Sequence, residues 1–531
     1  MGGMGNPMIT ALLQPQAYPH LTSSISLLET HISWVILTGT YAYKLKKPVN
    51  LGFADFSSLE RRRHFCQEEL RLNQRLAPQL YLDLVEIHGP AERANLLGQG
   101  PLIEVAVRMR QFEQEDLLPR ALAAGTLTGE HLENFAERLA VFHSASPQAS
   151  AEGPFGTPEA VVAPALANLE VLQRLQPGLT AQASLAEWTH QEARRLQSVF
   201  AERLARGRIR EGHGDLHLGN LVLQQGEVVG FDCLEFNPAL RWIDVVSDLA
   251  FLAMDLRHSG KRVWAGRLLN RWLIACGDYD ALHTWPWYLT YRALVRAKVL
   301  ALRLEQRAGV KDQTQRNLVE QLDSYWQLAL QTSGASGSGA LLLTQGVSGS
   351  GKSHLANQLC QRHGWIHLRS DVERRRLFGR WGSEVDSPRQ GEAYSPAITA
   401  EIYGEILPEA ARAALHAGET VVVDATFLKK QQRKRFVRLA RQLQVPCLIL
   451  VCPITPELAQ SRIEARSASN RDPSEADVSV LSKQWGALEP LGDEELPHHI
   501  LCSEIDQVDR LLQERLPMLF KTTRSPLPPG C

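Results

Sequence analysis

The sequence lacks the segments that would direct the chain into a membrane or an export pathway. No run approaches the ~18 uninterrupted apolar residues that a membrane span needs. The N-terminus, MGGMGNPMITALLQPQ, has no basic region followed by an apolar core, and Asn6 stands where N-myristoylation needs Ser or Thr. We therefore expect a cytoplasmic protein without a membrane partner.

Disulfide motifs, zinc motifs and an excess of one charge are also missing. The eight cysteines are scattered and include no C-x-x-C pair, which favours reduced thiols. The 57 basic residues are balanced by 58 acidic ones, which argues against a chain-wide electrostatic grip on nucleic acid. A length of 531 residues exceeds what one core supports and predicts two or three domains.

A Gly- and Ser-rich stretch at 331–339 has the composition of a flexible linker and divides the chain into residues 1–330 and 340–531. In the C-terminal part, helices alternate with predicted apolar strands at 340–344, 365–368, 420–424 and 447–451. This alternation predicts an α/β domain with a doubly wound parallel sheet, covered by helices on both faces.

The N-terminal part has a different order of elements. It shows β-like alternation over 31–49 and 102–111 and is mostly helical from residue 115 onward. This order predicts an α+β domain in which a small sheet-rich lobe precedes a helical lobe.

Residues 346–353, GVSGSGKS, fit the phosphate-binding pattern G-x-x-x-x-G-K-[ST] between a predicted strand and a predicted helix. The backbone around Gly346, Gly349 and Gly351 is expected to cradle the phosphates of ATP. Lys352 is expected to reach the β- and γ-phosphates, and the Ser353 hydroxyl to bind Mg²⁺.

A second phosphotransfer pattern lies at 213–220, HGDLHLGN, with the spacing of the kinase catalytic loop H-R-D-L-x-x-x-N. In such a loop a carboxylate, here Asp215, faces the acceptor hydroxyl, and an amide oxygen, here Asn220, holds Mg²⁺. Asp232 ends the next predicted strand, at the position expected for the second metal ligand.

These residues resemble the aminoglycoside phosphotransferase-like branch of the kinase fold. The resemblance implies a strand that carries the ATP lysine, either Lys44 or Lys46, and a helical partner, Glu69. We favour Lys44, because its spacing from Ala42 matches the kinase V-A-I-K motif. Residues 235–237 and 241–248 could form a substrate network, but a buried structural network is favoured.

The segment at 368–374, LRSDVER, resembles the D-x-x-R element of polynucleotide kinases and zeta-toxin-like kinases. Asp371 would then be the base and Arg374 the anion clamp, the alternative being a helix N-cap Asp with a surface Arg. Asp424, at the end of a predicted strand, is expected to bind Mg²⁺ or substrate, unless it is an N-cap.

Basic residues near the C-terminal motifs suggest two further features. Of Arg462, Arg466 and Arg471, we expect Arg466 to close over the phosphates as part of a lid. The basic helix over 429–443 lacks interleaved aromatics and is interpreted as a solvated face, although Arg433 could bind a phosphate.

The whole chain resembles bacterial bifunctional aminoglycoside phosphotransferase/ATP-binding proteins. The resemblance implies two ATP- and Mg²⁺-dependent sites that phosphorylate hydroxyl groups of small molecules. Two other hypotheses stay open: a regulatory nucleotide-binding protein, and a C-terminal domain that is a nucleic-acid 5′-kinase. Neither acceptor nor the oligomeric state follows from the sequence.

Overall fold

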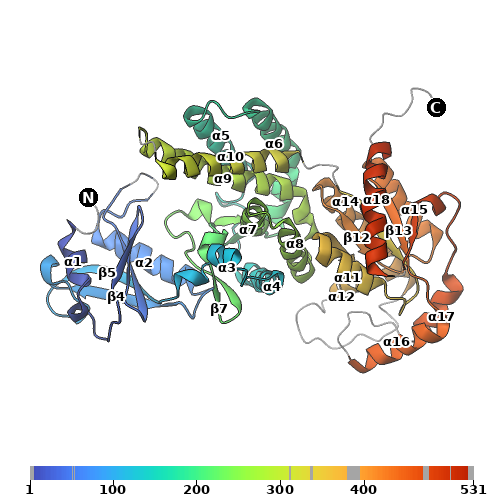
Figure 1. The fold of residues 1–531 in the computed structure, drawn as a ribbon, viewed down its shortest axis with the longest axis horizontal. Coiled ribbons are helices and arrows are strands. Elements are labelled where there is room, and N and C mark those ends of the chain that lie inside the picture. The colour runs from blue at the N-terminus through green and yellow to red at the C-terminus, as the bar shows by residue number, and fades with distance from the viewer. Residues whose placement is uncertain are drawn as a thin grey trace. The chain divides into compact units, whose positions relative to one another are not determined.

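A computed structural model describes most of the chain, namely residues 5–50, 52, 54–309, 312–334, 339–378, 395–469, 478–502 and 504–523. By its contacts the chain forms two compact units (Figure 1). The first comprises Met1–Ala163 and Phe200–Leu252, and the second comprises Pro164–Val199 and Ala253–Cys531.

The first unit starts with a five-stranded antiparallel sheet in the order β1-β2-β3-β5-β4. Its strands are β1 (Ser26–Glu29), β2 (Ser33–Leu37), β3 (Tyr41–Lys46), β4 (Tyr81–His88) and β5 (Leu102–Arg110). One core forms between the sheet and α1 (Pro7–Leu12), and another lies beside α2 (Leu59–Asn73). The predicted sheet-rich beginning is confirmed.

Two small antiparallel pairs complete the β-structure of this unit: β6 (Ile209–Glu211) with β9 (Trp242–Asp244), and β7 (Leu221–Gln224) with β8 (Glu227–Gly230). The α-helices that lie wholly in the first unit are α1, α2, α3 (Leu118–Ala124) and α4 (Gly129–Ala145). Three others have residues in both units: α5 (Pro158–Leu175), α6 (Gln182–Ala205) and α7 (Val245–His258).

The first helices that lie wholly in the second unit are α8 (Arg262–Cys276), α9 (Trp285–Gln306) and α10 (Gln313–Ser333). Helix α10 continues three residues into the stretch that composition predicts as a linker. It does so because Thr332 is buried, and its hydroxyl lies 2.8 Å from that of Thr290 on α9. Residues 335–338 of the predicted linker lie outside the described residues.

The C-terminal sheet has five parallel strands in the order β11-β12-β10-β13-β14, which confirms the predicted parallel sheet. They are β10 (Leu341–Gln345), β11 (Ile366–Arg369), β12 (Val421–Asp424), β13 (Cys447–Val451) and β14 (His499–Leu501). Strands β10 and β12 are wholly buried, as their continuous apolar sequences predict.

Helices cover this sheet on both faces (Figure 1). Helices α11 (Lys352–His363) and α18 (Ile505–Thr523) pack together on one face, in a core with Leu342, Val422 and Leu448. Helix α14 (Leu407–His416) precedes β12, and α15 (Lys430–Gln442) connects β12 to β13. Because connections between parallel strands are right-handed, both helices lie on the other face of the sheet. The remaining helices are α12 (Ser370–Leu377), α13 (Pro396–Glu401), the π-helix Ile402–Ile406, α16 (Pro456–Ser469) and α17 (Val478–Ala487).

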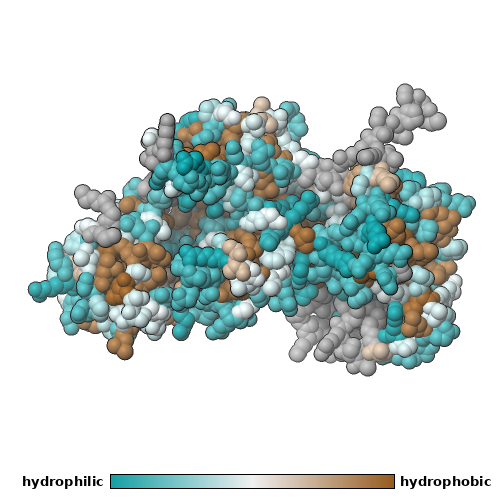
Figure 2. All heavy atoms as spheres, viewed as in Figure 1, coloured by the Kyte–Doolittle hydropathy of each residue, from teal (hydrophilic) through white to brown (hydrophobic). Residues whose placement is uncertain are grey.

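On the face shown in Figure 2, apolar residues occur in small groups separated by hydrophilic residues. None of the described helices combines the length and the apolar composition that crossing a bilayer requires.

Two candidate phosphotransfer sites

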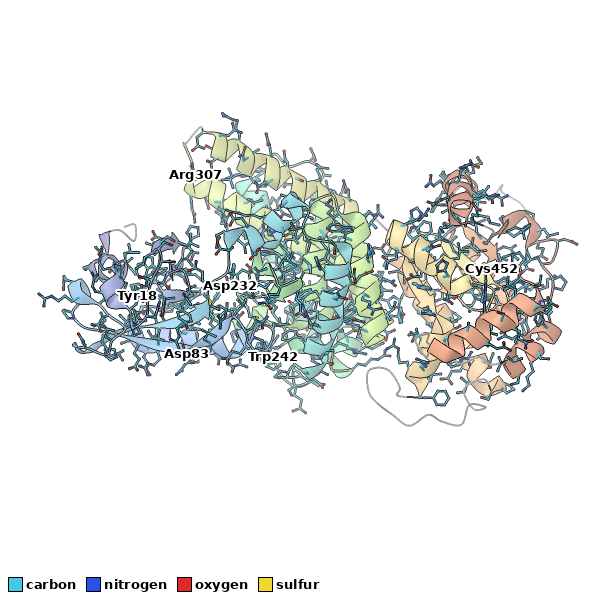
Figure 3. The ribbon with its side chains drawn as sticks, turned by 60° about the horizontal axis from the view of Figure 1, so that its bottom comes forward. Tyr18, Asp83, Asp232, Trp242, Arg307 and Cys452 are labelled. Carbon is cyan, nitrogen blue, oxygen red and sulfur yellow. The ribbon has the colours of Figure 1, made fainter. Side chains whose placement is uncertain are left out.

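The first candidate site is built around Lys44 on strand β3. Its Nζ lies 2.6 Å from Oε1 of Glu69 on α2 and donates to Oδ1 of Asp232. Glu69 is wholly buried, whereas 41% of the Asp232 side chain is exposed, so the lysine joins a buried anchor to an accessible carboxylate. Figure 3 marks Asp232, which follows β8.

Lys46 occupies a different position, although it lies on the same strand face as Lys44. Its Nζ is fully buried, 2.5 Å from Oε2 of Glu69, and it donates to Glu235, which is also buried. A lysine enclosed in this way has no accessible surface for a phosphate. The geometry therefore favours Lys44 as the ATP lysine and gives Lys46 a structural part.

Electrostatics keep Lys44 and Glu69 charged. Burial by itself lowers the pKa of Lys44, but Asp232 and Glu69 outweigh it and hold that pKa well above its usual value. Burial by itself raises the pKa of Glu69, but Lys44 and Lys46 lower it to about 2. Glu69 is therefore an anion at neutral pH that fixes both lysines.

Asp248 on α7 fixes the backbone of the catalytic loop through hydrogen bonds. The Asp248 carboxylate is fully buried and accepts from the backbone N–H of His213 at 2.7 Å and from that of Gly214 at 2.9 Å. Burial lowers the pKa of His213, whose Nε2 lies 2.9 Å from the carbonyl oxygen of Phe231. A buried carboxylate thus fixes the turn that presents Asp215.

Asp215 and Asn220 are joined by hydrogen bonds, and Asp232 follows Phe231, whose backbone N–H donates to the Asn220 carbonyl oxygen at 3.0 Å. Asn220 Nδ2 donates to the Asp215 carbonyl oxygen and to its Oδ2, both at 2.9 Å. The backbone N–H of Asp232 donates to the Tyr81 hydroxyl at 3.1 Å, and Asp232 has a φ of +64°. Asp and Asn tolerate this left-handed conformation better than most residues, which suits a carboxylate turned off the end of a strand.

The segments 235–237 and 241–248 contribute to a structural network rather than to an open pocket. Arg203 and Asp244 form a buried ion pair, with Arg203 Nε 2.5 Å from Asp244 Oδ2. Glu211 accepts from Arg71 at 2.8 Å and from Arg241 at 3.1 Å. The favoured interpretation of these segments agrees with the contacts, although nothing in their spacing distinguished Asp248 as the support of the loop.

The second candidate site surrounds the loop from Gly346 to Ser353, between β10 and α11. Gly346, Gly349 and Gly351 have φ angles of 152°, 82° and 89°. A Cβ on Gly346 would lie 2.7 Å from the Cys452 carbonyl oxygen, and one on Gly349 would lie 2.7 Å from that of Ala459. Glycines are therefore required here for conformation and for close packing. Cys452 is marked in Figure 3.

Lys352 folds back over the loop, with Nζ donating to the Val347 carbonyl oxygen at 2.8 Å. A cavity of about 700 Å³ opens beside it. The predicted residues that line this cavity are Gly349, Gly351, Lys352, Ser353, Asp371, Arg374 and Asp424. The structure thus brings the predicted phosphate loop, base, clamp and metal ligand to one space.

Asp371 is the second residue of α12, directly after strand β11. The helix N-cap is Arg369, so the structure does not support the alternative in which Asp371 is an N-cap. Arg374 is 6% exposed and lines the cavity, which likewise rules out a surface arginine. Asp371 and Arg374 therefore both line the same cavity.

Asp424 is the last residue of β12 and is buried. Its Oδ2 lies 3.1 Å from Nε2 of His367 and 3.4 Å from Nε of Arg369, both on β11. Burial by itself raises the pKa of Asp424, but the hydrogen bond from His367 and the nearby cations lower it to about 2. An anion at this strand end is suited to a hard cation such as Mg²⁺.

No three His, Cys, Asp or Glu side chains of the described residues converge on a metal position. Mg²⁺ commonly takes one or two protein ligands and completes its shell with phosphate oxygens and water. Asn220 with Asp232, and Ser353 with Asp424, would be ligand sets of that size.

Of the three arginines considered for a lid, Arg462 has a described side chain. Arg462 lines the cavity, and its Nη1 donates to the Gly349 carbonyl oxygen at 3.2 Å. Arg466 lies in α16, but its side chain is outside the described part of the structure, as is the whole of Arg471. Arg462, which sequence reasoning ranked below Arg466, is therefore the arginine seen at the phosphate loop.

Arg433 does not face the cavity. It is fully buried, donates to Glu495 at 2.8 and 3.0 Å, and also donates to backbone carbonyl oxygens, among them Phe427 at 3.0 Å. The expectation that it could bind a phosphate is wrong, because its donors are used inside the fold.

Comparisons with known proteins agree with the fold of both domains. Residues 54–285 match the model of the phosphotransferase enzyme family, and residues 341–491 match the model of an AAA domain. The fold and these matches define a phosphotransferase with an aminoglycoside phosphotransferase-like kinase domain and a P-loop kinase-like domain.

The chain belongs to the same family as the uncharacterized proteins Rv2004c and MT2060 of Mycobacterium tuberculosis and Mb2027c of Mycobacterium bovis. It is 31% identical to each over 464 residues, which cover 86% of this chain and 89% of the relative. The similarity therefore includes both kinase-like domains.

Solved structures with similarity fall into two groups. A choline/ethanolamine kinase family protein from Mesorhizobium loti is 14% identical, with a TM-score of 0.38, over 63% of this chain and 95% of that chain. A gluconokinase from Sinorhizobium meliloti is 18% identical, with a TM-score of 0.21, over 35% of this chain and 95% of that chain.

Proposed function

We propose that each domain transfers the γ-phosphoryl group of Mg·ATP to a hydroxyl group of a small molecule. The observation that carries this proposal is that both sites contain a carboxylate for the acceptor in addition to groups for the nucleotide. A protein that only binds nucleotide would need the loop, the lysine and the metal ligands, but it would not need Asp215 or Asp371.

In the N-terminal site, Lys44 would bind the ATP phosphates while Glu69 holds it in place. Asn220 and Asp232 would hold Mg²⁺, and Asp215 would orient the acceptor hydroxyl and accept its proton. The hydrogen bonds from Asn220 to Asp215 would keep the base and the metal ligand in a fixed relation.

In the C-terminal site, Lys352 would contact the β- and γ-phosphates, and Ser353 and Asp424 would hold Mg²⁺. Asp371 would be the base. Among the described residues, five with cationic side chains line the cavity, namely Lys352, Arg374, Lys429, Arg462 and Lys483. The acidic residues in the same described lining are Asp371 and Asp424, so the cavity suits anionic ligands: the phosphates of ATP, and an acceptor that carries an anionic group, with Arg374 as its clamp.

A nucleic-acid 5′-kinase is a second candidate for the C-terminal domain, favoured by one observation. Helix α15 contains no acidic residue, and its basic residues 430, 434, 438 and 441 recur at helical spacing. The residue before the helix, Lys429, lines the cavity, so a polyanion could follow this stripe away from the reacting hydroxyl. A 5′-hydroxyl oligonucleotide, tested beside small phosphorylated alcohols, separates the two candidates.

Counting nucleotide sites tests the proposal. Titration calorimetry of the full chain with a non-hydrolysable Mg·ATP analogue should give two sites. Lys352→Ala should remove only the C-terminal one, because it deletes the cation that contacts the β- and γ-phosphates. A stoichiometry of one, with all binding lost in Lys352→Ala, would refute a two-kinase protein.

A further inference from the structure

Helix α8 contacts three elements of the C-terminal site: α11, β11 and α12. It lies within residues 54–285, the segment that matches the phosphotransferase family, yet it belongs to the compact unit that contains the P-loop. The contacts are made by Gly266, Asn270 and Ile274, which are four residues apart and therefore lie along one face of the helix.

The first contact is between backbones. A Cβ on Gly266 would lie 2.0 Å from the carbonyl oxygen of Gly364, and a Cβ on Gly364 would lie 2.7 Å from that of Val263. Gly364 has a φ of +69° and caps α11, the helix that begins with Lys352. Helix α8 therefore rests directly on the end of the P-loop helix.

The second contact is with the edge of the sheet. Asn270 Oδ1 accepts from the backbone N–H of His367 at 2.8 Å. Strand β11 is an edge strand, so this donor has no neighbouring strand on that side, and the Asn270 side chain takes the place of one. His367 is also the residue whose ring contacts Asp424.

The third contact fixes α12. Arg376 Nη2 donates to the Ile274 carbonyl oxygen at 3.0 Å, and its guanidinium lies over Gly277, where a Cβ would be 2.5 Å from Cζ. Gly277 is the C-cap of α8, so Arg376 places a cation at the negative end of that helix. Arg376 Nε also donates to Glu373 Oε2 at 3.0 Å, which ties the guanidinium to its own helix.

Helix α12 needs such an anchor. It has eight residues, a length that is marginal for a helix without tertiary contacts. Arg376 attaches it to α8, while Asp371 and Arg374 of the same helix line the cavity. The position of the candidate base therefore depends on a helix more than 90 residues before it in the chain.

We propose that α8 is a structural part of the C-terminal kinase site and that Arg376 is a positioning residue, which holds α12 so that Asp371 and Arg374 face the cavity. The proposal rests on the proposed function of that site. It implies that loosening the attachment of α12 to α8 lowers the rate of phosphoryl transfer and leaves nucleotide affinity nearly unchanged, because Lys352 does not lie on α12.

The test uses the full chain with Arg376→Ala, and Arg362→Ala as the matched control. Arg362 is an arginine on α11 whose ion pairs are with Asp506 and Asp509 on α18. Hydrogen exchange of residues 370–378 measures the attachment of α12 without any need for an acceptor. We expect exchange at least about tenfold faster in Arg376→Ala than in the wild type. Exchange in Arg376→Lys should be slower than in Arg376→Ala, and exchange in Arg362→Ala should equal that of the wild type.

The second readout is the slow hydrolysis of Mg·ATP, in which water replaces the acceptor and ADP and phosphate are released. An Asp215→Asn background removes the turnover of the N-terminal site. We expect Arg376→Ala to lower kcat by roughly 10–100-fold, in the range for a catalytic group displaced by about 1 Å. The KM for ATP should stay within about twofold.

The outcomes separate this inference from the proposed function. Unchanged exchange over 370–378 in Arg376→Ala overturns the positioning role, whatever the turnover. Absence of any hydrolysis in the Asp215→Asn parent counts against the proposed function, and the exchange result still decides the role of Arg376. If Arg376→Ala does not fold, Asn270→Ala serves instead, and unchanged exchange at 366–369 then overturns the part assigned to α8.

Discussion

The Nζ atom of Lys44 lies 2.6 Å from Oε1 of Glu69, and the carboxylate end of this ion pair has no exposed surface. The other oxygen of Glu69 lies 2.5 Å from Nζ of Lys46, which is wholly buried. One carboxylate thus fixes two lysines, of which Lys44 pairs further with the partly exposed Asp232 and Lys46 with the buried Glu235.

Substitution of these lysines should separate ATP binding from stability. Lys44→Ala should weaken Mg·ATP binding at the N-terminal site with a small change in melting temperature, because Lys46 still compensates Glu69. Lys46→Ala should destabilise the fold by about 3–5 kcal/mol, since it leaves Glu235 and half of Glu69 as uncompensated buried charges. Calorimetry and thermal unfolding of both variants measure the two effects. The opposite pattern would make Lys46 the ATP lysine.

Acidification should act on the same cluster. The pKa of Glu69 is about 2 in the folded protein, below its ordinary value, because Lys44 and Lys46 outweigh burial. A lowered folded pKa contributes stability that is present above the unfolded pKa and is lost as pH falls toward the folded pKa. We expect stability to fall between about pH 4.5 and pH 2, and the denaturant midpoint of Glu69→Gln to vary less over that window.

The two carboxylates of the N-terminal site should fail in different ways. Asp215→Asn should reduce phosphoryl transfer by about 10²–10⁴-fold while sparing ATP affinity, because this side chain faces the acceptor. Asp232→Asn should weaken Mg·ATP binding, since it removes a metal ligand and the partner of Lys44, and Asn accepts the φ of +64°. Equal loss of nucleotide affinity in both variants would contradict these roles.

At the C-terminal site, Asp371→Asn should lower turnover by about 10²–10⁴-fold, the usual range for a positioned acid–base group, with ATP affinity nearly unchanged. Arg374→Ala should raise the KM of an anionic acceptor more than it lowers kcat. Single-turnover transfer by the full chain, in an Asp215→Asn background, measures both once an acceptor is identified. Full activity in Asp371→Asn would show that this carboxylate only begins a helix.

The phosphate loop and the catalytic loop could be predicted from the sequence because their chemistry requires fixed residue types at fixed local spacing. Lys44 and Lys46 could not be separated in that way. Their side chains leave the strand on the same side, and what distinguishes them is Glu235, which lies 189 positions along the chain from Lys46.

Other contacts gave no local signal at all. Asp248 holds the catalytic loop, but in the sequence it is an ordinary residue of a helical pattern. Arg433 lies in a run of basic residues, and only the structure shows that it pairs with Glu495. Asn270 and Arg376 look like surface residues in the sequence, because their partners are backbone groups of distant segments. Long-range pairings of this kind carry no periodicity, so only the three-dimensional structure reveals them.

The close approach of Gly266 to Gly364 limits which P-loop regions could be joined to α8 by recombination. A methyl group on either glycine would overlap the facing backbone, so the two segments match each other only as a pair. A recombination event that replaced residues 340–531 with the P-loop region of another protein would bring in a partner not matched to α8. We therefore expect α8 and residues 340–531 to be inherited and transferred together.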